Sequence, residues 1–491
     1  MKVYKELAGQ TIIYGLGTII PRILNFLLTP LYTYTLTNQS DFGVITELYS
    51  YVAFFMVFLT FGMETTFFRY SNSSENKRLI FNNSFGTLLF TSSLFLIIIL
   101  TLKNQIAGTI GYSNHSMLIV YLAFIIFFDV ITAIPLAKLR NDNKVVFFTV
   151  IRTLNVAINI GLNVFFFVIC KDSHNEFLSS LYNPSIGVGY AFISNLAASF
   201  FTFVILLPQI FKFNFKIDFL ILKKMLKYAA PLVIVGLAGM VNEVADKIFL
   251  KYITPEYLVP LKQVAIYGAN YKLAVLMTIF IQMFKYAAEP FFFKYSGNDD
   301  AKNIYSKIMT WFVIFCLFIF LLVSLNLDIF KYLIGSNYRS GLYIVPIILA
   351  ANMFLGIYYN LSVWYKLNNL TKYGAVISLV GVVITVVLNF SLIPVIGYLG
   401  SAIATFACYF SMMIISFFIG KKFYKIEYQV KRIVGYVFLV FFLFILHTLM
   451  QFNQLYLNIL FSSGLILFYL FIVIKVESIN FENFKMFFKK A

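Results

Sequence analysis

The chain has 491 residues, of which 61% are hydrophobic, 19% aromatic and only 12% charged. A soluble chain carries about 25% charged residues, so this composition excludes a water-soluble globular protein. The net charge of +18 would suit a nucleic-acid partner, but the basic residues lie in short loops between apolar segments. That placement is typical of a multi-pass membrane protein and argues against nucleic acid as a partner.

Apolar segments of spanning length follow one another along the whole chain. Crossing the hydrocarbon layer of about 30 Å takes about 20 mostly apolar residues in a helix. We therefore predict an all-α membrane protein with about fourteen transmembrane helices. They lie near residues 8–36, 42–66, 79–102, 116–138, 146–170, 186–211, 227–253, 264–289, 305–326, 340–363, 373–394, 398–420, 433–450 and 455–475.

Basic side chains are distributed unequally between the two sets of loops. The loops on the side of the N-terminus hold most of them, among them Lys77, Arg78 and Lys212. The opposite loops hold only Lys103, Lys171, Lys251, Lys262, Lys331 and Arg339. Because cytoplasmic loops are enriched in Lys and Arg, we predict that both termini are cytoplasmic.

An internal repeat relates the first two spans to the seventh and eighth. A shift of 225 residues places Arg22 on Lys247, Gly43 on Gly268, and the segment 64–70 on 289–295. An even number of spans separates the copies, so both have the same membrane orientation and are related by an axis along the membrane normal. This symmetry predicts two six-helix lobes around a central cavity, with alternating access as the mechanism.

The repeat also sets the predicted domain boundaries. The N-lobe covers residues 1–215 with spans 1–6, and the C-lobe covers 216–425 with spans 7–12. Residues 426–491 form two additional helices and a basic cytoplasmic tail.

Cations inside the spans are the first candidates for a functional site. A charge at mid-membrane costs about 2.5–3.5 kcal/mol, so such side chains usually face a bundle interior or a wet cavity. We predict that Arg22, Lys247, Lys272 and Arg152 line the cavity and bind a phosphate or another anionic group. The alternative is that each pairs with a neighbouring acid, as Glu243 and Lys247 could do at i,i+4 spacing.

Acids inside the spans are candidates for ion coupling or gating. Asp129 and Asp246 are the best coupling candidates, because a mid-span carboxylate can change protonation or bind sodium. A salt bridge from Asp129 to Arg22 or Arg152 is the alternative. Further candidates are Glu243 and Glu47 within spans, and Glu64 and Glu289 at span ends, where anchoring at the interface competes with gating.

No sequence motif indicates a cofactor or an enzyme. Cys170, Cys316 and Cys408 are isolated, as are the three histidines, so metal-ligand spacing is missing. We find no P-loop, no GxSxG motif and no GxGxxG motif opening a helix. We therefore predict a transporter without a cofactor, coupled at most to Na⁺ or H⁺.

Several segments resemble bacterial polysaccharide-biosynthesis flippases of the superfamily of multidrug, oligosaccharide-lipid and polysaccharide exporters. They are Ala8-Gly-Gln-Thr-Ile-Ile-Tyr-Gly-Leu-Gly17 with Pro21-Arg22, Leu28-Thr-Pro-Leu-Tyr-Thr33 with Asp41-Phe-Gly43, Asp129 through Pro135 to Leu139-Arg140, Asn242-Glu-Val-Ala-Asp-Lys-Ile-Phe-Leu250, and the Tyr-Gly motif Ile266-Tyr-Gly268 leading to Tyr286-Ala-Ala-Glu-Pro-Phe-Phe-Phe293. The similarity covers nearly the whole chain, although each motif is short.

The resemblance implies two six-helix lobes plus two C-terminal helices. It also implies movement of an undecaprenyl-pyrophosphate-linked oligosaccharide, such as a lipopolysaccharide O-antigen precursor, from the cytoplasmic to the outer leaflet. Arg22 matches the first-helix arginine of the family pattern, and Lys272 matches the basic position after the Tyr-Gly motif. Implied partners are the lipid-linked oligosaccharide, membrane lipids, and a polysaccharide polymerase or chain-length machinery.

Two other functions compete with this interpretation. A cation-coupled multidrug antiporter of the same fold needs cavity acids, but intramembrane cations here are at least as numerous as acids. A membrane polysaccharide polymerase commonly has a long outer loop with clustered Arg or His. The largest outward loop here, around 171–185, has His174 without a basic cluster.

Overall fold

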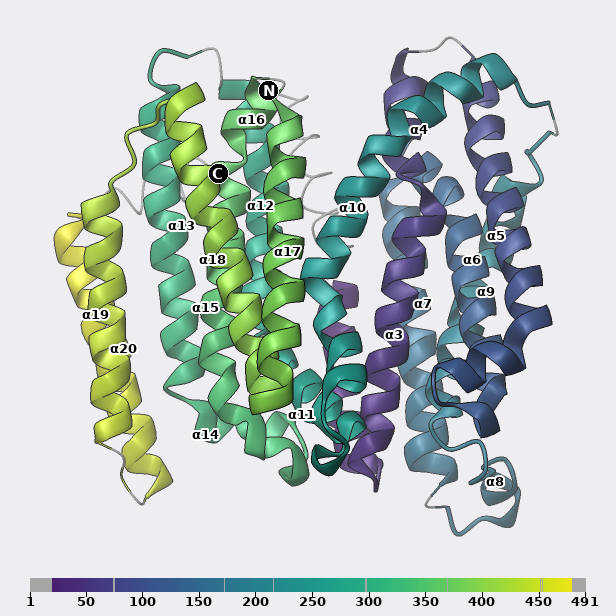
Figure 1. The fold of residues 1–491 in the computed structure, drawn as a ribbon, viewed down its shortest axis with the longest axis horizontal. Helices are drawn as coiled ribbons and strands as arrows, with labels where there is room; N and C mark the ends of the chain where they lie inside the picture. The colour runs from purple at the N-terminus through teal and green to yellow at the C-terminus, as the bar shows by residue number, and fades with distance from the viewer. Residues whose placement is uncertain are drawn as a thin grey trace. The chain divides into compact units, whose positions relative to one another are not determined.

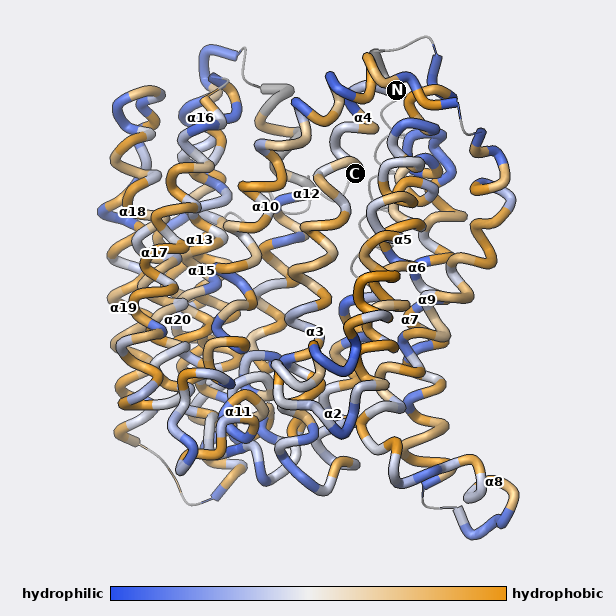
Figure 2. The backbone as a smooth tube through the Cα atoms, turned by 45° about the vertical axis from the view of Figure 1, so that its right-hand side comes forward, coloured by the Kyte–Doolittle hydropathy of each residue, from blue (hydrophilic) through white to orange (hydrophobic). Residues whose placement is uncertain are grey.

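The computed structural model describes residues 20–73, 76–171, 173–214, 216–295, 298–368, 370–450, 452 and 454–478. Within these residues the regular structure is entirely helical. Apolar residues colour most of the helix bodies, and hydrophilic residues gather at the turns (Figure 2). This pattern is what the low charge content and the short basic loops predict.

Twelve helices among the described residues are long and apolar enough to cross a membrane. Pro260–Leu273 and Val275–Lys285 form a thirteenth span if this broken pair is counted as one. These spans coincide with the predicted segments from 42–66 to 455–475, which confirms an all-α, multi-pass membrane protein. The first predicted span, 8–36, lies partly outside the described residues, so the count of fourteen stays approximate.

The chain forms two compact units. Unit 1 comprises residues 1–272 and 375–408, and unit 2 comprises 273–374 and 409–491. The division into an N-lobe and a C-lobe at residues 215 and 425, which the repeat predicts, is a separate proposal about symmetry and stays a prediction.

Most helices of unit 1 are labelled in Figure 1, and α2 is labelled in Figure 2. They are α2 (Leu28–Thr35), α3 (Gln39–Thr60), α4 (Met63–Ser73), α5 (Lys77–Thr109), α6 (Ser116–Asn141), α7 (Val145–Val164), α8 (Glu176–Ser180), α9 (Gly189–Ile210), α10 (Phe219–Ile253) and α11 (Pro260–Leu273), with most of α17 (Thr371–Ile396) and the first half of α18 (Tyr398–Phe423). Short turns η1 (Ser113–His115), η2 (Phe165–Cys170) and η3 (Glu256–Leu258) connect or extend them.

Unit 2 contains α12 (Val275–Tyr295), α13 (Ala301–Ser324), α14 (Leu327–Phe330), α15 (Val345–Leu361), α16 (Val363–Leu367), α19 (Val430–Leu449), α20 (Leu455–Val476) and the turns η4 (Lys331–Leu333) and η5 (Ser336–Ile344). Helix α13 packs on α15, and the C-terminal pair α19–α20 packs on α13 (Figure 1). The hydroxyl of Tyr469 on α20 donates to the carbonyl of Ile314 on α13 at 2.9 Å, which ties this pair to the unit.

Polar side chains begin several helices of unit 1. Asn38 caps α3, Asn76 caps α5, and Asp218 caps α10, each accepting a hydrogen bond from a backbone N–H in the first turn. Such caps satisfy backbone donors that have no partner within the helix. They fix where the long apolar helices start.

Two glycines that the repeat makes equivalent lie where α3 meets α11. A Cβ atom at Gly43 would lie 2.1 Å from the carbonyl oxygen of Leu261, and one at Gly268 would lie 2.8 Å from Thr46. Only glycine permits so close an approach of the two helices. The repeat-equivalent helices of unit 1 are therefore in direct contact at repeat-equivalent positions.

Candidate functional site

A cavity of unit 1, hereafter the central cavity, has a volume of about 420 Å³. It is lined by residues of α2, α3, α7, α9, α10 and α11, together with Asn25. Its charged lining residues are Glu243, Lys247 and Lys272. A volume of roughly 300–1,000 Å³ is typical of ligand sites, so the central cavity is the principal candidate site of this unit.

Amides and tyrosines form a neutral polar wall of the central cavity. The Tyr32 hydroxyl donates to Asn163 at 2.8 Å, and Asn163 in turn donates to the side chain of Asn159 at 2.9 Å. Asn195 donates to the Tyr49 hydroxyl at 3.1 Å. These bonds link α2 with α7 and α3 with α9, so the wall presents polar groups in fixed positions.

Lys247 is neutralised within the protein. Its Nζ lies 2.8 Å from Oδ1 of Asp246, and its side chain is only 12% exposed. The other oxygen of Asp246 accepts a hydrogen bond from the Tyr267 hydroxyl at 2.6 Å. The carboxylate that pairs with Lys247 is therefore that of Asp246 and not that of Glu243. The main-chain carbonyl of Glu243 accepts a hydrogen bond from the Lys247 ammonium at 3.2 Å.

Lys272 differs from Lys247 in its surroundings. It lies in the last turn of α11, where its side chain is exposed and lines the central cavity. Among the described residues, no carboxylate lies within 4.0 Å of its ammonium group. It is repelled electrostatically by Lys247 and Arg22 and attracted by Glu243. Lys272 thus lies within electrostatic range of three other predicted site residues, Lys247, Glu243 and Arg22.

The family described as "Polysaccharide biosynthesis protein" matches residues 7–296. The chain belongs to this family. A comparison with curated proteins gave no match.

Several solved structures share the fold of this family member. It aligns with a lipid II flippase MurJ in an inward closed conformation, with a TM-score of 0.71, 15% identity, and 95% of this chain and 100% of that chain covered. An inward-facing multidrug resistance MATE family transporter of the MOP superfamily aligns with a TM-score of 0.60 and 14% identity, and the alignment covers 84% of this chain and 94% of that chain. A Pyrococcus furiosus MOP superfamily transporter is described as having a binding pocket of reverse polarity. It aligns with a TM-score of 0.60 and 13% identity, and the alignment covers 84% of this chain and 94% of that chain. At such identities these similarities establish the fold.

Three other predicted residues of this family member do not line the central cavity. Arg22 lies in the helical stretch 20–26 and is exposed. Asp129 on α6 and Arg152 on α7 attract each other electrostatically, although they form no ion pair within 4.0 Å. Asp129 also lies within electrostatic range of Tyr49, which does line the cavity.

Glu47 is part of a buried ion pair that the sequence did not indicate. Its carboxylate oxygens lie 2.9 Å from Nζ of Lys251, and it accepts a hydrogen bond from Tyr112. Lys251 also donates to the carbonyl of Ile110. The charge distribution assigns Lys251 to an outer loop, but Lys251 lies in the last turn of α10, where the ion pair ties α10 to α3.

The two predicted acids at span ends have different outcomes. Glu64 on α4 forms an ion pair with Arg140 on α6 at 2.5 Å, and both side chains are more than one third exposed. The side chain of Glu289 on α12 lies outside the described residues.

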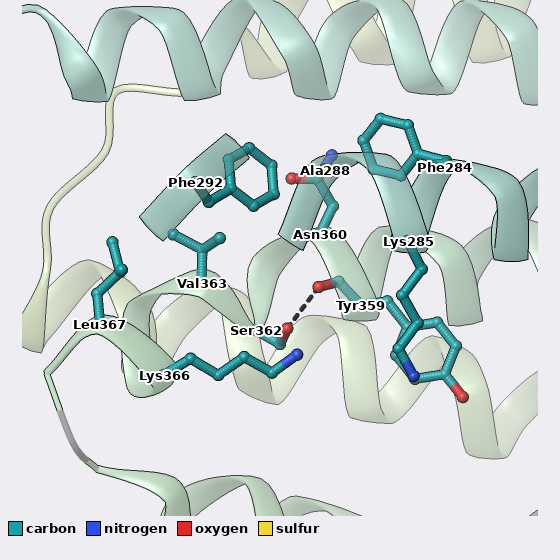
Figure 3. Close-up of a pocket in the computed structure, with 10 residues that line it drawn as sticks. All are labelled: Phe284, Lys285, Ala288, Phe292, Tyr359, Asn360, Ser362, Val363, Lys366 and Leu367. Atoms are coloured by element: carbon teal, nitrogen blue, oxygen red, sulfur yellow. Dashed lines mark hydrogen bonds between the residues drawn. The ribbon is translucent and has the colours of Figure 1, made fainter. Parts of the chain in front are cut away.

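A small cavity of unit 2 is lined by Lys285, Tyr359, Asn360 and Lys366, among others (Figure 3). Its volume of about 20 Å³ has room for about one water molecule. It cannot hold a sugar or a pyrophosphate in this conformation. Among the described residues, no group of three His, Cys, Asp or Glu side chains could hold a metal ion.

Proposed function

We propose that this protein is a flippase that moves an undecaprenyl-pyrophosphate-linked oligosaccharide from the inner to the outer leaflet of the bacterial cytoplasmic membrane. The chain belongs to a polysaccharide biosynthesis family and shares its fold with a lipid II flippase. One observation carries the proposal: Lys272, a cation without an ion-paired carboxylate among the described residues, lines a cavity in a membrane-spanning unit.

The chemistry of the central cavity supports an anionic, hydroxyl-rich head group. An uncompensated ammonium within the membrane is costly, and a pyrophosphate offers it charge-assisted hydrogen bonds. The amides of Asn155 and Asn195 and the hydroxyls of Tyr32 and Tyr49 can exchange hydrogen bonds with sugar hydroxyls. The polyprenyl tail can stay in lipid while only the head group passes through the cavity.

Alternating access is the transport mechanism in this proposal, driven by Na⁺ or H⁺ where a coupling ion is used. Among the predicted acids, Glu243 lines the central cavity beside Lys272, so it is the acid best placed to respond to substrate. Both termini are proposed to be cytoplasmic, with polysaccharide polymerase or chain-length proteins as functional partners. The protein is proposed to be a transporter and not an enzyme.

A cation-coupled multidrug antiporter is the second candidate, because several solved structures with this fold are MATE transporters. Such an antiporter would use Glu243 as its cation site. The two candidates predict opposite charges for the ligand of the central cavity.

Gene deletion followed by complementation tests the proposal. The deletion strain should accumulate lipid-linked oligosaccharide in the inner leaflet and lose surface glycan, and the wild-type gene should restore both. Lys272→Gln should restore little, whereas Lys262→Gln should restore fully, because Lys262 is exposed on the same helix and does not line the cavity. Normal glycan export in the deletion strain together with increased drug sensitivity would favour the antiporter.

A further inference from the structure

A second cavity of unit 1 lies at the end of α4, the start of α5 and the ends of α6 and α9. Its volume is about 370 Å³, and we call it the basic pocket. Four of its lining residues are cations, Lys77, Arg78, Lys138 and Lys212, and one is an acid, Asp142. No lining residue is shared with the central cavity.

The charges of the basic pocket are poorly compensated. Among the described residues, none of the four cations forms an ion pair within 4.0 Å. Lys138 is repelled by Arg78 and Lys212 and attracted by Asp142. Like charges gathered in one cavity destabilise each other, and a bound anion would reverse that effect.

Hydrogen bonds hold one wall of the pocket in place. The side-chain amide of Asn83 on α5 donates a hydrogen bond to the main-chain carbonyl of Asp218 at 3.2 Å, and its oxygen accepts one from the backbone N–H of Asp218 at 3.0 Å. Asn82 accepts from the backbone N–H of Asn214 at 3.3 Å. The connection from α9 to α10 is thereby fastened along α5, and Lys212 at its start is held beside the pocket.

The helix end and the aromatic lining add to the site. Lys77 and Arg78 occupy the first turn of α5, where the helix dipole is positive and favours an anion. Nζ of Lys138 lies 4.7 Å from the centroid of the Phe81 ring, and both Phe81 and Phe67 are buried lining residues. The pocket therefore combines positive charge with an apolar wall at the ends of membrane-spanning helices.

We propose that the basic pocket binds the phosphate group of an anionic membrane phospholipid. Basic pockets between transmembrane helices on the cytoplasmic side suit phosphate head groups, and the loops that form this one belong to the Lys- and Arg-rich side of the protein. The pyrophosphate of a polyprenyl carrier has the same chemistry. The assignment goes to phospholipid because the pocket shares no residue with the central cavity.

Lipid binding to the purified full-length protein tests this site. Phosphatidylglycerol and phosphatidylcholine are titrated into the protein in non-ionic detergent, and bound lipid is counted by native mass spectrometry. The variant Arg78→Gln/Lys212→Gln should bind phosphatidylglycerol on the order of tenfold more weakly than wild type. The charge-matched control Lys223→Gln/Lys224→Gln, on exposed residues of α10, should bind like wild type. Arg78→Lys/Lys212→Arg should also bind normally.

Two results would overturn the proposal. Equal binding of phosphatidylglycerol by wild type and Arg78→Gln/Lys212→Gln would show that the basic pocket is not the site. Competition by undecaprenyl pyrophosphate is measured in the Lys272→Gln background, where binding at the central cavity is weakened. Displacement of phosphatidylglycerol there would assign the pocket to the carrier lipid. Neither result depends on whether the protein transports oligosaccharide.

Discussion

A lysine within the membrane must be compensated by a carboxylate, by water or by a ligand, and Lys247 and Lys272 are compensated differently. Lys247 is paired with Asp246, and that acid is further held by Tyr267. Lys272 has no such partner among the described residues. Of the predicted cavity cations, Lys272 is therefore the one whose charge is most available to a substrate.

Replacing Lys272 should weaken the binding of anionic substrate without unfolding the protein. A hydrogen bond to a charged group contributes about 1.5–3 kcal/mol, so Lys272→Gln should bind undecaprenyl pyrophosphate about tenfold to a hundredfold more weakly. Titration of the purified protein measures this affinity. Lys272→Arg should retain most of it, and Lys262→Gln all of it. Unchanged affinity in Lys272→Gln would remove this lysine from the site.

The ion pair between Glu47 and Lys251 should contribute to stability. Breaking a buried pair by removing one partner costs about 3–5 kcal/mol, because the other charge stays buried. Lys251→Met should therefore lower the melting temperature in detergent, and the double variant Glu47→Gln/Lys251→Met should recover part of the loss. Glu64→Gln, which removes an exposed ion pair, should cost about 1 kcal/mol or less. Equal effects at the two pairs would contradict the buried network.

The sequence identified charged residues in the spans but could not assign their partners. Asp246 and Lys247 are adjacent, and helical spacing favoured Glu243 as the partner of Lys247. The pairing of Glu47 with Lys251 joins residues 204 positions apart, so no local pattern could have indicated it. Among the residues that sequence reasoning missed are Asn155, Asn159 and Asn195. Their positions within predicted spans could have indicated a polar cavity, because an amide side chain that faces lipid without a hydrogen-bond partner is costly.

At the scale of helices, close packing of α3 on α11 should be sensitive to one methyl group. Gly43→Ala would place a Cβ atom 2.1 Å from the Leu261 carbonyl oxygen, so the helices must move apart. Overpacking of this kind costs about 1–3 kcal/mol, which should lower the melting temperature. Gly161→Ala is the control, since its Cβ would meet open space. If both variants melt alike, the two helices do not approach as described.

Helix positions were predictable from the sequence because apolar length alone determines them. The segments 42–66 and 305–326 correspond to Gln39–Ser71 and Ala301–Ser324. The sequence did not indicate the break between α11 and α12 at Ala274, because residues 264–289 contain no proline and their one glycine, Gly268, lies six residues before the break. The equivalence of Gly43 and Gly268 was visible as a repeat, but their direct contact required the structure.

For the whole molecule, the distribution of basic residues makes a prediction about orientation. Glu176→Cys, in the loop that contains α8, should be labelled by a membrane-impermeant maleimide in intact cells. Lys223→Cys, in the first turns of α10, should be labelled only after the cells are permeabilised. The native cysteines Cys170, Cys316 and Cys408 are buried, so they should give little background. The reverse pattern would invert the proposed topology.

The central claim is that the protein moves a pyrophosphate-linked sugar head group across the membrane, and reconstitution tests it most directly. Purified protein is incorporated into liposomes that contain undecaprenyl-pyrophosphate-linked oligosaccharide in both leaflets, and a soluble glycosidase is added outside. With wild-type protein the enzyme should reach oligosaccharide from both leaflets, whereas with Lys272→Gln or empty liposomes it should reach only the outer pool. Digestion confined to the outer pool with folded wild-type protein, under an imposed Na⁺ or H⁺ gradient, would contradict the account.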